Sequence, residues 1–327
     1  MKTLKFLFIF LLNLKFIFSQ EYTTTVEILN EKNIQLKSKI ENNLSEILNT
    51  LTEASFKNEK TIKLSSDVST KYGINSINEL WNSRKFRTIE TELLVYLLKN
   101  PNNTKYDIRN VPLIQLDDDG ENVFQSGIFT FTSDGKLDDI KFGLPEKDSK
   151  QFTRTGINVD DRSRRLLILD FIEDFRTAYD RKNLKYIKNV FSEDAIIIVG
   201  RVIKVEKGGI KLKGNVEDEK VELIEYSKKE YIKNLESVFK RNAFIKLKFD
   251  SIEITQSRVN NKIYAINLIQ EWKSKNYQGG RYEDKGYLFV LIDFTNEEEP
   301  MIHVRAWEPY GNTNPDKKLV LGDFRIN

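Results

Sequence analysis

The stretch from Leu166 to Gly200 constrains the fold more than any other part of the 327-residue chain. Apolar residues recur in it at the helical spacing i, i+4, i+7 and i+11, at Ile168, Ile172, Phe175 and Tyr179. Asn183 can cap a second, short helix with an inner face of Leu184, Ile187 and Phe191. The run Ala195–Val199 is typical of a strand covered on both sides. The stretch therefore predicts two helices followed directly by a buried strand.

The residues after this stretch predict one more helix and a sheet. Ser227 and Glu230 form a capping-box pattern that opens a helix reaching about Arg241. Four strands follow, at Phe244–Thr255, Lys262–Lys273, Gly286–Phe294 and Met301–Glu308. The connections are too short for helical crossovers, so we expect antiparallel pairing.

The N-terminal half shows a similar alternation of patterns. Helices are predicted at Val26–Thr52 and Ser69–Arg84, with a short strand at Thr61–Ser66 between them. Phe86–Leu98 is β-prone, and further strands are predicted at Asp107–Leu116, Asn122–Thr132 and Leu137–Leu144. Ser69–Phe86 also aligns with Ser227–Phe244 without a gap. We therefore expect a tandem repeat of one α+β fold, with domains at 21–145 and 166–327 and a linker at 146–165.

Residues 1–20 have the pattern of a signal peptide, with an early positive charge and an apolar run at Phe6–Leu12. Cleavage near Ser19–Gln20 would lower the count of basic residues from 52 by three, to the same number as the 49 acidic ones. A near-neutral mature chain argues against nucleic-acid binding. The chain has no cysteine and no later membrane-length apolar segment. We expect a disulfide-free protein exported to the periplasm or the extracellular space, without a transmembrane span once mature.

The sequence FRTAYDRKNLKYIKNVFSEDAIII, and the helix and four strands after it, resemble the nuclear transport factor 2-like superfamily, which includes SnoaL-like proteins and ketosteroid isomerases. The resemblance implies a curved antiparallel sheet wrapped on helices to form a cone, often with a pocket. It covers 166–308 well and 26–144 weakly. The C-terminal half, ending in IHVRAWEP, is also similar to uncharacterised secreted Bacteroidetes proteins. Members of the superfamily include enzymes, binding proteins and dimerisation modules, so the fold does not define the function.

The isomerase chemistry of that superfamily lacks its residues in this chain. By resemblance, the general-base carboxylate falls on Val199 and the oxyanion-stabilising tyrosine on Phe175. Valine cannot take up a proton, and phenylalanine cannot donate a hydrogen bond. This counts against ketosteroid-isomerase chemistry.

Candidate binding residues lie on the predicted last strand. His303, the only histidine, alternates with Arg305 and Trp307, which favours either a polar aromatic patch at the cone mouth or a partner interface. We prefer the alternative, an exposed strand face or a structural histidine, because alternation alone does not say which face of the strand is covered. A single histidine and no cysteine argue against a multi-histidine or cysteine metal site, and we expect no metal and no cofactor.

Glu271, Trp272 and Tyr287 are further candidates for a ligand or partner site, because they lie on neighbouring predicted strands. For the two aromatic residues, simple core packing is the preferred interpretation. Asp117–Gly120 suggests calcium, but the twelfth position of such a loop is Ile128, so a hairpin turn is preferred.

The sequence thus favours a non-catalytic exported module that acts through a pocket or sheet face of the second domain. Its partner would be a small apolar ligand or an envelope protein. A SnoaL-like isomerase or dehydratase is the first alternative. A structural module that forms a homodimer through its sheet face is the second.

Overall fold

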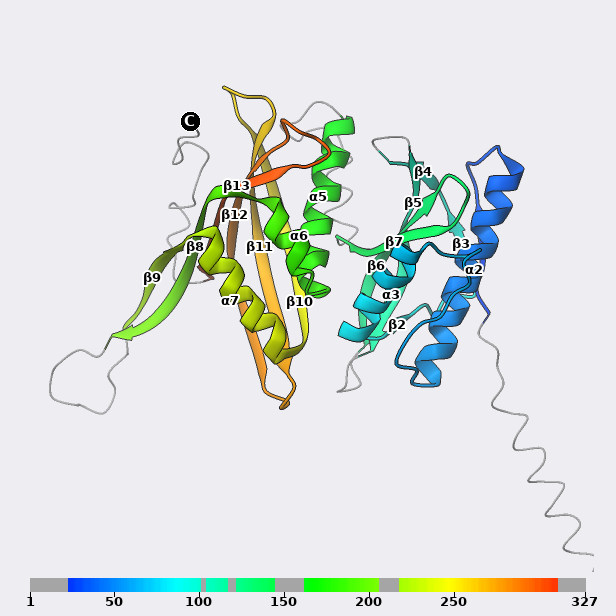
Figure 1. Ribbon diagram of the computed structural model, residues 1–327, viewed down its shortest axis with the longest axis horizontal. Helices are drawn as coiled ribbons and strands as arrows, with labels where there is room; N and C mark the ends of the chain where they lie inside the picture. The colour runs from blue at the N-terminus through cyan, green and yellow to red at the C-terminus, as the bar shows by residue number, and fades with distance from the viewer. Residues whose placement is uncertain (1–22, 101–103, 117–121, 145–161, 206–217, 311–327) are drawn as a thin grey trace, which may run out of the picture.

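The computed structural model describes residues 23–100, 104–116, 122–144, 162–205 and 218–310. They form two α+β halves that lie side by side (Figure 1). The predicted signal peptide, the acidic Asp117–Gly120 turn and most of the predicted 146–165 linker lie outside the described residues. None of the described helices is long and apolar enough to cross a membrane.

The C-terminal half is a curled six-stranded sheet packed on helices. Its helices are α5 (Arg162–Asp180), α6 (Leu184–Val190) and α7 (Lys228–Arg241). Its strands are β8 (Phe191–Val205), β9 (Asp218–Tyr226), β10 (Asn242–Gln256), β11 (Ile263–Asn276), β12 (Arg281–Asp293) and β13 (Met301–Pro309). They lie in the order β10-β11-β12-β13-β8-β9, and only the β13–β8 pair is parallel. The four predicted antiparallel strands are confirmed.

The predicted helix caps of this half are confirmed. Asn183 Oδ1 accepts a hydrogen bond from the backbone N–H of Tyr186 at 3.0 Å, and so opens α6. Ser227 and Glu230 form a complete capping box at α7. The helix α5 begins at Arg162, so the last four residues of the predicted linker are helical instead.

The described part of the N-terminal half contains two helices and two sheets. Its helices are α2 (Ile34–Phe56) and α3 (Lys71–Ser83). Its strands are β1 (Thr25–Ile28), β2 (Phe86–Arg87), β3 (Glu92–Val95), β4 (Leu97–Lys99), β5 (Lys105–Leu116), β6 (Asn122–Thr132) and β7 (Leu137–Gly143). The larger sheet has the order β2-β5-β6-β7, with β4 also paired to β5, while β1 pairs in parallel with β3.

Two predictions for this half are wrong. Val26–Ile28 belongs to a strand instead of the first helix, because its two apolar side chains alternate inward beside β3. The Thr61–Ser66 segment forms no strand, since the backbone N–H of Ile62 bonds to the side chain of Asn78 at 2.8 Å and not to a neighbouring strand.

The two halves share one sequence of elements. In each, a helix leads into a strand meander whose spatial order follows the chain, α3 into β2-β5-β6-β7 and α7 into β10-β11-β12-β13. The final strand of each then pairs in parallel with an earlier segment. This partner is the part of β8 up to Val199 in the C-terminal half, but only a single Ser69–Leu137 bridge among the described residues of the N-terminal half. The tandem repeat stays a prediction.

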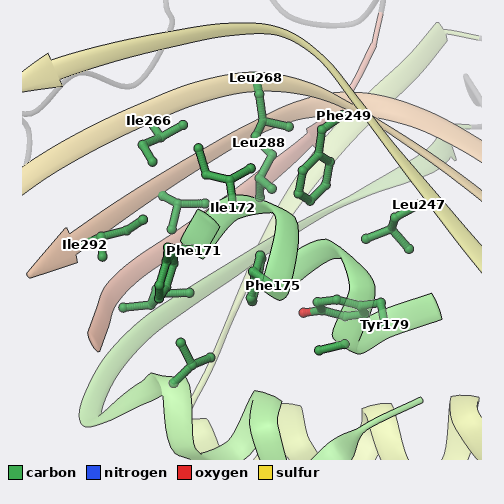
Figure 2. Close-up of a cluster of buried hydrophobic side chains, with 14 of the residues drawn as sticks. Phe171, Ile172, Phe175, Tyr179, Leu247, Phe249, Ile266, Leu268, Leu288 and Ile292 are labelled. Carbon is green, nitrogen blue, oxygen red and sulfur yellow. The ribbon is translucent and has the colours of Figure 1, made fainter. Parts of the chain in front are cut away.

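The core of the C-terminal half lies between α5 and the sheet (Figure 2). Phe171, Ile172, Phe175 and Tyr179 of α5 lie in one cluster with apolar side chains of strands β10, β11 and β12. Phe175 is 3% exposed, stacks on Phe171 and meets the Tyr179 ring edge-on at 5.2 Å between centroids. Each buried aromatic of this kind stabilises the fold by about 1.5–3 kcal/mol. The apolar stripe predicted from the sequence is therefore the packing face of α5.

Ion pairs join α5 to the N-terminal half. Glu173 is fully buried and accepts a hydrogen bond from Arg109 Nη2 at 2.5 Å. Lys141 Nζ, also buried, donates to Asp170 at 2.7 Å and to Asp174 at 2.8 Å. Desolvation raises the pKa of Asp174 to about 7, even though Lys141 opposes that shift. Because buried charges are costly unless they are paired, these ion pairs hold α5 against the N-terminal half.

Candidate functional site

A cavity of about 890 Å³ opens between α7 and the sheet of the C-terminal half. Its floor is formed by inward side chains of β11, β12 and β13, and one wall by α7. The β8–β9 hairpin forms the opposite rim with Val199, Arg201, Ile224 and Tyr226. A cavity of this size fits a drug-sized organic molecule.

Arg305 lies at the floor of this cavity with only 6% of its surface exposed. Its guanidinium carbon is 5.4 Å from the centre of the Tyr231 ring, and Nε has no hydrogen-bond partner. No carboxylate of the described residues forms an ion pair with it. Burial lowers the pKa of Arg305, but the polar groups around it outweigh that effect and raise the pKa above its ordinary value. Arg305 is therefore a buried cation without a counter-ion in the described part of the chain.

Trp307 lies on the same strand and also faces the cavity, with an indole Nε1 that has no partner. Its position depends on Gly286, its near neighbour on β12. A Cβ at position 286 would lie 2.2 Å from the Glu308 carbonyl oxygen and 2.6 Å from Trp307 Nε1. Only glycine therefore allows the indole to lie across β12.

Two buried acceptors lie on the adjacent strands. Gln270 and Asp284 both line the cavity, and one oxygen of each, Gln270 Oε1 and Asp284 Oδ1, is buried without a hydrogen-bond partner. The other carboxylate oxygen of Asp284 accepts a hydrogen bond from the Tyr282 hydroxyl at 2.8 Å. Desolvation raises the pKa of the Asp284 carboxyl, although Tyr282 and Arg305 oppose the shift. Since buried polar groups are normally satisfied, this floor is built for further hydrogen bonds.

The aromatic residues around Arg305 form a connected wall. The hydroxyls of Tyr179 and Tyr231 lie 2.7 Å apart, and the Tyr179 ring meets Trp272 edge-on at 6.1 Å. Desolvation raises the pKa of Tyr179 well above its usual value, so this hydroxyl stays protonated at neutral pH. The wall offers apolar surface and neutral hydroxyls, but no charge that balances Arg305.

The sequence-predicted residues divide between the two faces of the sheet. Arg305, Trp307 and Trp272 line the cavity together. The pairing of β11 with β12 is regular around Glu271 and Tyr287, and each of them is adjacent in sequence to residues that face inward. Because side chains alternate along a regular strand, both lie on the opposite face of the sheet. There Glu271 pairs with Lys285 at 2.8 Å, and Tyr287 stacks on Tyr310 at 5.1 Å.

His303 does not share the face of Arg305 and Trp307, contrary to the strict alternation expected. The pairing register shifts between Ile302 and Val304, so the residue between them is an extra one. His303 Nε2 lies 3.7 Å from Asp293 and does not line the cavity. Of the predicted patch of His303, Arg305 and Trp307, only Arg305 and Trp307 therefore share a face.

Sequence reasoning missed Tyr231, Gln270, Asp284 and Gly286. A signal existed for two of them, because Gln270 and Asp284 interrupt the inward-facing apolar positions of β11 and β12. Val199, which we compared with the isomerase base, lines the cavity, whereas Phe175 lies in the core. Only one of the two compared positions therefore faces this cavity.

No family model matches the chain, and no curated protein matches it in sequence. Among solved structures, the chain is similar to a putative scytalone dehydratase from Novosphingobium aromaticivorans, with a TM-score of 0.34 and 12% identity over 45% of this chain and 93% of that one. It is similar to a putative aromatic ring hydroxylase from the same organism, with a TM-score of 0.33 and 14% identity over 44% and 87%. It is also similar to a nuclear transport factor 2-like superfamily protein from Salmonella enterica, with a TM-score of 0.33 and 11% identity over 46% and 94%. The last of these carries the name of the superfamily that the sequence resembles.

Proposed function

We propose that this protein is a non-catalytic module that binds a small organic molecule in the cavity of its C-terminal half. The observation that carries the proposal is the cavity of about 890 Å³ whose floor holds four buried polar atoms without partners, on Gln270, Asp284, Arg305 and Trp307. Leaving such atoms unpaired costs about 1–3 kcal/mol each, and a bound molecule would recover part of that cost.

A small-molecule enzyme is the second candidate, because one feature favours it. Asp284 combines a raised pKa with a tyrosine hydroxyl at 2.8 Å inside a cavity, which is an arrangement suited to proton transfer. No second acidic or basic group of fitting chemistry faces Asp284 across the cavity, since its other titratable lining residues are arginines, tyrosines and Lys285. Binding therefore ranks above catalysis.

The binding proposal is tested by native mass spectrometry of the purified protein, followed by a ligand-observed NMR screen with a fragment library. The cavity is blocked by Val238→Trp, which places an indole on the α7 wall. The matched control is Lys233→Trp, on the exposed face of the same helix. We expect fragments that bind the wild type and the control but not Val238→Trp. Equal binding to all three would reject the cavity as the site.

The enzyme alternative is tested on the same fragments. Hydrolysis, dehydration or isomerisation of a bound fragment that disappears in Asp284→Asn would favour the enzyme over the binding module. Unchanged fragments after prolonged incubation support the binding module.

We also propose that the module acts after export, on the strength of the signal-peptide pattern in residues 1–20. Determination of the mature N-terminus in the native cell tests this directly. A start near Gln20 supports export, and an intact Met1 in the mature protein rejects it. The proposed repeat of one fold in 21–145 and 166–327 is supported by the common order of helix and meander strands.

A further inference from the structure

We infer that the ligand of this cavity is an organic monocarboxylate with an apolar body, and that Arg305 is its counter-ion. The inference deepens the proposed function and rests on it. The unpaired charge of Arg305 at the cavity floor indicates the carboxylate, and the apolar walls indicate the body of the ligand.

Arg305 supplies the charge argument. A buried cation is costly unless it is paired, and this one is 6% exposed with no ion-pair partner in the described residues. Its nearest electrostatic partners are Tyr231, Tyr179 and Asp284. Burial raises the pKa of Tyr179 well above its usual value, so this hydroxyl carries no charge, and Asp284 forms no ion pair with Arg305 and has one oxygen without any partner. A ligand carboxylate would supply the missing negative charge.

The geometry of a guanidinium favours a carboxylate in particular. Its planar N–H groups match the two oxygens of a carboxylate in a bidentate pair. A single buried guanidinium balances one negative charge, whereas a phosphate monoester at neutral pH would bring nearly two. The indole N–H of Trp307 adds a second unpartnered donor on the same strand face. One cation and one neutral donor therefore fit a monoanion.

The rim of the cavity carries positive charge. Arg201, Arg241 and Arg281 line it, whereas the Lys285 ammonium is paired with Glu271 on the opposite face of the sheet. Asp284 is the only acidic lining residue among the described residues. A cleft lined by one sign of charge concentrates ligands of the opposite sign and increases their association rate. This observation favours an anion independently of Arg305.

The walls define the body of the ligand. Trp272, Leu235, Val238 and Ile224 present apolar surface between the charged rim and the floor. An ion without an apolar part, such as acetate or inorganic phosphate, would leave most of this surface and volume unused. We therefore expect a molecule whose carboxylate reaches the floor while a ring or branched chain contacts the walls.

Two probes of nearly identical shape test the inference, 1-naphthylacetate and its neutral amide 1-naphthylacetamide. Calorimetry on the full protein measures both dissociation constants. We expect the carboxylate to bind the wild type at least about tenfold more tightly than the amide, which is the gain of one charge-assisted pair. In Arg305→Met that preference should vanish, while amide binding stays. Arg258→Met, a control at an exposed position outside the cavity, should keep the preference for the carboxylate.

Because removal of a buried arginine can unfold a domain, a second measurement follows ligand binding to the wild-type protein. The indole N–H resonance of Trp307, assigned with Trp307→Phe, should shift with the carboxylate and stay in place with the amide. Equal affinities of the two probes, or an unchanged resonance, would overturn the inference and leave the cavity proposal intact. Failure of both probes while other fragments bind the cavity would overturn it as well. Loss of all fragment binding would reject the proposed function instead.

Discussion

The buried pair of Glu173 and Arg109 offers the sharpest test of how the two halves are held together. Glu173 is fully buried on α5. Its Oε2 accepts from Arg109 of β5 at 2.5 Å, and its Oε1 accepts from the backbone N–H of Leu144 at 2.9 Å. Replacement by glutamine keeps one acceptor but places an amide N–H₂ against a guanidinium. The variant Glu173→Gln therefore removes the charge while preserving the shape.

The expected loss follows from burial. Breaking a buried ion pair costs about 3–5 kcal/mol, because one charge is left uncompensated. Arg109 retains Asp170 at 3.7 Å, so we place the loss at the lower end, about 3 kcal/mol. That is more than a hundredfold change in the folding equilibrium at about 1.4 kcal/mol per factor of ten.

The control is a pair with the same distance but different exposure. Arg164 Nη2 and Glu297 also lie 2.5 Å apart, with 49% of the Glu297 side chain exposed. The variant Glu297→Gln should cost no more than about 1 kcal/mol. Guanidinium unfolding at neutral pH measures both losses, with tryptophan fluorescence reporting Trp81 in one half and Trp272 and Trp307 in the other. A loss for Glu173→Gln no larger than that of the control would refute the reasoning.

Four further outcomes are expected. Phe175→Ala should lower the free energy of unfolding by about 3–5 kcal/mol in urea titrations, because the stacked core cannot refill the space. Ser227→Ala should cost about 1 kcal/mol in the same assay through loss of the α7 capping box. Gly286→Ala should displace the Trp307 indole and reduce fragment binding at the cavity, seen by NMR. Asp180, 5% exposed, has a pKa raised by burial from 3.8 to about 6, so the folded state binds its proton more tightly than the unfolded state. Its contribution to stability therefore grows as pH falls from about 7 to 4, and Asp180→Asn should lose about 2 kcal/mol relative to wild type between pH 7.5 and 4.5 in paired urea titrations.

The helices and long strands were predictable because their patterns are local. The Ile168–Tyr179 stripe and the capping residues Asn183 and Ser227 each depend on neighbours within a few positions, and the structure confirms them. The strand at Val26–Ile28 was not predictable in this way, since its partner β3 lies more than sixty residues away. A short apolar segment beside a helix takes its conformation from that distant partner, which periodicity does not report.

The candidate site was half predictable, and the reason lies in one residue of β13. Strict alternation from His303 correctly places Arg305 and Trp307 on one face, since the strand is regular beyond Val304. The register shift at His303 then removes the histidine from that face, and no residue type in the segment announces a bulge. The same shift lets Ile302 point into the core and Arg305 lie at the cavity floor, although the two residues are three positions apart and would point to opposite faces of a regular strand. Without the bulge, a strand with Ile302 inward would turn Arg305 to the opposite face. The irregularity that defeated the sequence-based prediction is thus what allows one strand to complete the core and supply the buried cation.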